Sequence, residues 1–165
     1  MNITTKQLED NIFKLIENDW MLITAGDKEK ANTMTASFGG FGVFCFKNIA
    51  IIYVRPERYT YEFLEKHPTF SLSFFEPEFK QKLTFCGRNS GKDHDKFNEC
   101  GFTLSYTENQ TPVINEARIN IECKTMYKQD IKKDCFTDLE AFEKTYSSGG
   151  MHRMYVAEIL NVSIK

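Results

Sequence analysis

Hydrophobic and polar positions along the chain follow a helical period at the start and strand-like patterns after it. Residues 6–18 place Leu8, Ile12, Leu15 and Ile16 at helical spacing, which predicts an amphipathic opening helix. Short β-branched or aromatic runs bounded by Gly, Pro or Asp are typical of strands. Strands are predicted at residues 20–25, 33–38, 49–54, 70–75, 119–127 and 153–164, the last bent near Asn161.

Helices between these strands are expected to be short. They are predicted at residues 60–66, at residues 78–86 between Pro77 and Gly87, and at residues 92–100 before Gly101. Residues 128–150, with a helical turn at residues 139–144, resemble a long surface excursion. Strands do not alternate regularly with long helices, so we expect a mainly β fold, a closed β-barrel with peripheral helices.

The composition narrows the class of protein. A length of 165 residues predicts a single domain spanning residues 1–165. The net charge of −2 shows no excess of basic residues that would point to nucleic-acid binding. No apolar run approaches the ~20 residues of a membrane helix. Because the polar start lacks a signal-peptide core, we expect a cytoplasmic protein. The aromatic content of 14% suits strands, or a site for a flat ligand.

The cysteines indicate neither a disulfide framework nor a metal site. Cys45, Cys86, Cys100, Cys123 and Cys135 are an odd number at wide spacings, without a CxxC pair. We therefore expect reduced thiols and no bound metal.

Residues 31–40 alternate small hydroxyl residues with apolar ones and end in two glycines. Hydroxyls and amide N–H groups on such a strand can hydrogen-bond the edge of a flat heterocycle, and glycine lets the backbone approach it. An ordinary strand with surface Thr and Ser is the other interpretation.

A second candidate lies where the strand at residues 49–54 ends. Arg55 and Arg58 follow it three positions apart, and a helix begins near Thr60. A helix N-terminus with arginine and a hydroxyl suits a phosphate group. A solvated charge pair with Glu57 explains the same residues without a ligand.

A polar loop at residues 86–96 combines small residues with cations before a helix, and can complete an anion site. Its glycine spacing matches neither a P-loop nor a GxGxxG fingerprint, which disfavours a nucleoside triphosphate. Among the histidines, His67 and His94 fit solvated positions. His152 opens a strand and can reach into a barrel mouth, although a structural role is the commoner one for such a residue.

Four ordered segments, at residues 32–37, 54–60, 85–96 and 152–159, together resemble the flavin reductase-like, FMN-binding split-barrel family. The resemblance extends from about Trp20 to the C-terminus. It implies a split β-barrel, non-covalent FMN, and a homodimer with flavin sites at or near the subunit interface. Phe38 stands where many relatives have Trp, and Ala157 replaces a common Gly.

The resemblance also implies a role for each matching residue. The isoalloxazine ring and ribityl chain would be lined by Asn32, Thr33, Met34, Thr35, Ala36, Ser37 and Phe38. The phosphate would be surrounded by Arg55, Arg58, Tyr59 and Thr60, and the site closed by Ser90, Gly91, Lys92 and Lys96. His152 would lie close to the ring and the incoming reductant, as the candidate catalytic residue.

Three functions are compatible with this site. The first is an FMN-dependent oxidoreductase that takes a hydride from NAD(P)H and passes electrons to free flavin or another acceptor. The second is a flavoredoxin-like electron carrier with a protein redox partner. The third is a split barrel that holds flavin or another planar ligand without turnover.

Overall fold

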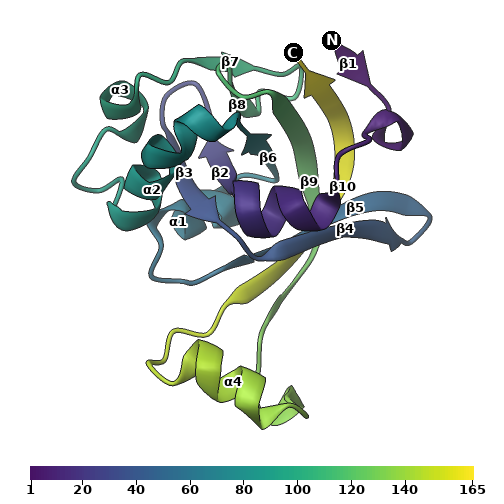
Figure 1. Cartoon of the computed structure of the whole chain (residues 1–165), viewed down its shortest axis with the longest axis vertical. Helices are drawn as coiled ribbons and strands as arrows, with labels where there is room; N and C mark the ends of the chain where they lie inside the picture. Colours follow the sequence, from purple (N-terminus) through teal and green to yellow (C-terminus); the bar gives the residue numbers. More distant parts are fainter.

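The computed structural model describes residues 1–165 as an antiparallel β-barrel with short helices around it (Figure 1). The strands are β1 (Asn2–Ile3), β2 (Met21–Gly26), β3 (Ala31–Ala36), β4 (Gly39–Phe44), β5 (Lys47–Val54), β6 (Thr69–Phe74), β7 (Leu104–Tyr106), β8 (Pro112–Ile114), β9 (Ile119–Asp130) and β10 (Arg153–Ile164). The α-helices are α1 (Tyr59–Lys66), α2 (Lys80–Arg88), α3 (Lys96–Cys100) and α4 (Leu139–Tyr146).

The main sheet runs in the order β3-β2-β6-β9-β10-β5-β4, with β1 added on β10 and every pairing antiparallel. Its two ends, β3 and β4, are not hydrogen-bonded to each other and are joined in the chain by Ser37 and Phe38. The mainly β barrel with peripheral helices is thus confirmed. The prediction of a fully closed barrel is wrong, because the barrel is split between β3 and β4.

Two apolar cores hold the fold. The larger lies inside the barrel and includes Ile23, Ile52, Phe70 and Tyr155, all fully buried. The smaller packs Leu22 of β2 against residues of α2 and α3, such as Leu83 and Cys100. Since neighbouring residues of β2 belong to different cores, the whole strand is buried.

The predicted strands agree with observed strands to within a few residues at their ends. Register shifts of β10 against β9 lie at Val156/Ala157 and Ile159/Asn161, which confirms the bend near Asn161. The sequence did not predict β4, whose residues GGFGVF lack the alternation of a half-buried strand. The short strands β1, β7 and β8 were also not predicted.

The prediction of one continuous helix at residues 6–18 is wrong. A single 3-10 turn covers Thr5–Gln7, where the Gln7 Oε1 accepts from the Thr4 amide at 2.9 Å, and a π-helical segment covers Lys14–Asp19. Leu8 and Ile12 nevertheless pack against the barrel core. The apolar spacing therefore predicts correctly which side chains face the core, and wrongly that the helix is continuous.

Other helix boundaries also differ. The predicted helix at residues 78–86 starts as a 3-10 turn at Pro77–Phe79, and α2 begins only at Lys80. The α3 helix begins at Lys96 rather than residue 92, because the Asp95 side chain accepts from the Asn98 amide and caps it there. The α2 helix continues through Gly87 to Arg88. A β-carbon at Gly87 would lie 3.3 Å from Cβ of Thr35, so this glycine serves helix–strand packing instead of ending the helix.

The last two long strands continue beyond the barrel and carry residues 131–151 between them, which we call the arm. The arm holds a 3-10 turn at Lys133–Cys135 and helix α4. Figure 1 shows α4 standing apart from the barrel, at the far ends of β9 and β10. None of the helices combines the length and apolar character needed to cross a membrane.

Candidate flavin site

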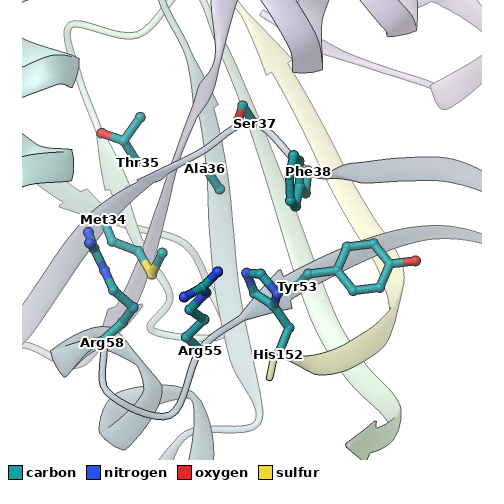
Figure 2. A pocket seen from close by; sticks show the side chains of 9 residues that line it. All are labelled: Met34, Thr35, Ala36, Ser37, Phe38, Tyr53, Arg55, Arg58 and His152. Carbon is teal, nitrogen blue, oxygen red and sulfur yellow. The ribbon is translucent and has the colours of Figure 1, made fainter. Parts of the chain in front are cut away.

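A cleft beside the split in the barrel consists of two adjoining cavities. The aromatic compartment, of about 230 Å³, is lined by Met34, Thr35, Ala36, Ser37, Phe38, Tyr53, Arg55, Arg58 and His152 (Figure 2). The cationic compartment, of about 150 Å³, is lined by Met34, Glu57, Arg58, Tyr59, Thr60, Arg88, Asn89, Ser90, Gly91 and Lys96. Met34 and Arg58 line both cavities, so the two adjoin.

The cationic compartment is held by hydrogen bonds between secondary-structure elements. Thr60, at the start of α1, is fully buried and accepts from the Asn32 Nδ2 on β3 at 2.9 Å. The loop after α2 passes so close to β3 that a β-carbon at Gly91 would overlap the Asn32 side chain. Because neither element has room to shift, this wall of the cleft is preorganised.

Two cations in this compartment are fixed by backbone carbonyls. Arg58 Nη1 donates to the Gly87 carbonyl at 2.9 Å, and Lys96 Nζ donates to the carbonyls of Thr33 and Cys86 at 2.8 Å each. Burial lowers the pKa of Arg58, and burial together with the Arg58 charge lowers the pKa of Lys96 to about 8.

Positive charge dominates the cationic compartment. Arg58, Arg88 and Lys96 face a single carboxylate, Glu57, among its lining residues. The amide end of α1 and the Ser90 hydroxyl add further donors to the same cavity. Charge-assisted donors converging on a small cavity fit a phosphate group.

The aromatic compartment has a different character. Phe38 remains 53% exposed on the two-residue link between β3 and β4. Its ring centroid lies 5.9 Å from that of His152, and the Tyr53 centroid lies 6.5 Å from the same imidazole. Burial and the Arg55 charge lower the pKa of His152, so its imidazole is neutral at neutral pH. The cavity offers flat apolar surface and an uncharged ring.

Arg55 joins this compartment to the arm. Its Nη2 donates to the Thr145 carbonyl at 3.1 Å and its Nη1 to the Gly149 carbonyl at 3.4 Å. In Figure 2 its guanidinium group lies beside the His152 ring. Arg55 and Arg58 therefore point to different places: Arg55 serves the aromatic compartment and the arm, and Arg58 reaches the cationic compartment.

The cleft gathers most of the predicted site residues. Three residues of the prediction line neither compartment: Asn32 lies behind Thr60, Thr33 turns its hydroxyl to Thr24 at 3.0 Å, and Lys92 pairs with Glu62 at 3.0 Å. The sequence prediction did not include four lining residues, Tyr53, Glu57, Arg88 and Asn89, as ligand contacts. Arg88 and Asn89 lie in the polar loop that the sequence had singled out.

The family described as "Flavin reductase like domain" matches residues 14–165, nearly the whole chain. The chain belongs to the flavin reductase-like family. This confirms the family inferred from the four sequence segments, and the match begins a few residues before Trp20. No curated protein sequence is significantly similar to the chain.

Solved structures confirm the split-barrel fold. A flavoredoxin from Methanosarcina acetivorans is similar at 22% identity and a TM-score of 0.69, over 100% of this chain and 75% of that one. An FMN-binding protein from Thermus thermophilus shows 16% identity and a TM-score of 0.69, over 99% and 82%. An NADH:FAD oxidoreductase from Streptomyces globisporus shows 18% identity and a TM-score of 0.65, over 89% and 75%.

Proposed function

We propose that this flavin reductase-like protein binds FMN in the cleft and uses it to pass electrons from NAD(P)H to a free flavin or another acceptor. The observation that carries the proposal is the pairing of the two compartments through Met34 and Arg58. FMN consists of a flat aromatic ring and a phosphate joined by a short polar chain, which matches an aromatic cavity next to a cationic one.

The cationic compartment is the proposed phosphate site. Arg58, Arg88 and Ser90 are its proposed donors, with the buried Thr60 in the wall behind them, and the buried ammonium of Lys96 adds positive charge. We leave Arg55 out of this group, because its guanidinium bonds the arm and lines the other compartment. A ligand with a terminal phosphate is therefore favoured over riboflavin.

The aromatic compartment is the proposed ring site. Residues 34–38 would run along one side of the ring, with Phe38 as an apolar surface. When bound, the flavin supplies the hydride and electron chemistry. The chain's part is to place backbone and hydroxyl donors at the ring edge and to hold the neutral His152 where a nicotinamide enters.

NAD(P)H as donor is supported by family membership and by the similar structure described as an NADH:FAD oxidoreductase. The decisive experiment is anaerobic stopped-flow mixing of the FMN-loaded protein with NADH and, separately, NADPH. Bleaching of the flavin absorbance with either nucleotide supports the proposal. A protein that binds FMN but is reduced by neither nucleotide contradicts the proposal and leaves the two alternatives, an electron carrier with a protein partner or a split barrel that holds flavin without turnover.

We further propose a homodimer. The β4–β5 hairpin and the link before it expose apolar side chains, among them Phe38, Val43, Phe44 and Phe46. Exposed apolar side chains gathered along one hairpin are typical of an interface. Light scattering at micromolar concentration should give twice the mass of one chain, and Phe46→Asp should lower it. A monomer that retains bound flavin contradicts the proposal.

A further inference from the structure

The arm carries its own aromatic cluster, formed by Phe136 before helix α4 and by Phe142 and Tyr146 on it. The ring centroids of these residues lie between 5.2 and 5.9 Å apart. Phe142 and Tyr146 are buried, although the arm stands apart from the barrel. The cluster therefore fixes the Tyr146 ring within the arm.

The arm contacts the cleft mainly through this tyrosine and its neighbours. The Tyr146 hydroxyl lies 2.9 Å from Nδ1 of His152. Arg55 holds the carbonyls on either side of that ring, at Thr145 and Gly149. Gly150 has a φ of +69°, and a β-carbon there would crowd the Glu57 carboxylate. The chain leaving α4 thus returns to His152 along a tightly held path.

Four ionisable side chains surround the His152 imidazole: Arg55, Glu57, Tyr53 and Tyr146. The pKa of His152 is lowered by burial and by Arg55, and burial raises the pKa of Tyr146. Both rings are therefore uncharged at neutral pH. In a neutral imidazole, the hydrogen bond made by one nitrogen decides where the single proton lies.

We propose that Tyr146 is a positioning residue, whose hydroxyl donates to Nδ1 of His152 and thereby keeps the imidazole proton on Nε2. The aromatic compartment then receives a neutral N–H donor in a fixed orientation. The acceptor with matching chemistry is a carbonyl oxygen, such as the carboxamide of an entering nicotinamide. This last step rests on the proposed function, whereas the proton position does not.

The test compares Tyr146→Phe with the unaltered protein, both loaded with FMN. Phenylalanine retains the aromatic cluster and removes the hydroxyl. Imidazole nitrogen chemical shifts of His152, measured by NMR at neutral pH, report which nitrogen carries the proton. Tyr127→Phe is the matched control, because its hydroxyl bonds Gln129 on the same strand and lies outside the cleft.

We expect His152 to carry its proton on Nε2 in the unaltered protein and in Tyr127→Phe, and to become a mixture of the two forms in Tyr146→Phe. Reduction by NAD(P)H should slow by about tenfold in Tyr146→Phe, with FMN affinity retained. Unchanged nitrogen shifts, or a proton on Nδ1 in the unaltered protein, overturn the role of Tyr146. If no nucleotide reduces the unaltered protein, the proposed function fails, and the shifts alone still decide the position of the proton.

Discussion

The two compartments of the cleft are built in different ways. In the cationic compartment, Thr60 is fully buried and Lys96 is 3% exposed, and both contact β3 directly. In the aromatic compartment, Phe38 is half exposed and His152 depends on the arm for its partner. The cationic half consists of helix and loop residues that buried hydrogen bonds fasten to β3. The aromatic half adds to strands β3 and β5 an exposed link and a histidine that bonds the arm.

The difference assigns two tasks to two parts of the cleft: one part retains the cofactor, and the other admits a second molecule. Side chains fixed by buried hydrogen bonds suit the retention of a cofactor, since little entropy is lost on binding. Side chains on a link and an arm suit the entry and exit of a second molecule. Substitutions in the cationic compartment should therefore change affinity, and substitutions around His152 should change rate.

The largest effect is expected at Arg58. Arg58→Ala should weaken FMN binding by about 1.5–3 kcal/mol, the range for hydrogen bonds to charged groups, and should weaken riboflavin binding less. Arg55→Ala is the comparison variant, and we expect it to affect both ligands alike because it lies in the aromatic compartment. Calorimetric titration of the unaltered protein and both variants measures the affinities for the two ligands. Equal losses for the two ligands in Arg58→Ala contradict the phosphate assignment.

Gly91→Ala tests the tight packing of the cationic wall. The added methyl group collides with the buried Asn32 side chain and breaks its bond to Thr60. We expect the free energy of unfolding to fall by about 1–3 kcal/mol, as for overpacked sites. In the control Gly42→Ala the new methyl group meets no atom within 4 Å. Urea denaturation should give clearly different free energies of unfolding for the two variants. Equal values would show that the Asn32 side chain and the loop can move to accommodate the methyl group.

Lys96 gives this half of the site a pH dependence. Its pKa of about 8 in the folded protein lies below the usual value for lysine. Between those two values the unfolded chain binds more protons, so this residue makes stability rise with pH, by at most about 1.4 kcal/mol per unit. Urea denaturation at several pH values should show that rise relative to Lys96→Met. Parallel curves for the two proteins would mean that Lys96 titrates normally.

His152→Ala addresses the other compartment. We expect FMN affinity to stay within about threefold, under ~1 kcal/mol, because His152 lies away from the phosphate side. Anaerobic reduction by NAD(P)H should slow by at least about tenfold, a barrier change of ~1.4 kcal/mol. Stopped-flow absorbance measures the rate. Loss of the flavin itself would move His152 to the cofactor-binding residues.

The sequence predicts the barrel well where strands are apolar, as at residues 49–54 and 70–75. It fails at β4, because three glycines among its six residues erase the pattern that identifies a strand. The opening helix fails for another reason. Helical spacing indicates which side chains are buried, and the extended backbone at Leu8 ends the turn at Thr5–Gln7 without changing that burial.

For the site, the family resemblance located β3, the start of α1 and the loop after α2, which together form the cleft. It could not distinguish Arg55 from Arg58, because three positions of separation do not show that one guanidinium turns to the arm. The sequence did not indicate a role for Tyr146 either. It lies six residues before His152, and only the fold of the arm brings its hydroxyl to that ring.

The split between β3 and β4 has a consequence for protein engineering. Ser37 and Phe38 span the gap where no ladder of backbone bonds fixes strand spacing, and both line the cleft. On β2, β5, β6, β9 and β10, by contrast, each strand pairs with a strand on both sides, and a new side chain must fit between them. A mutant library limited to these two positions should therefore yield mostly folded variants with differently shaped cavities, and so provides a direct route to altered ligand preference.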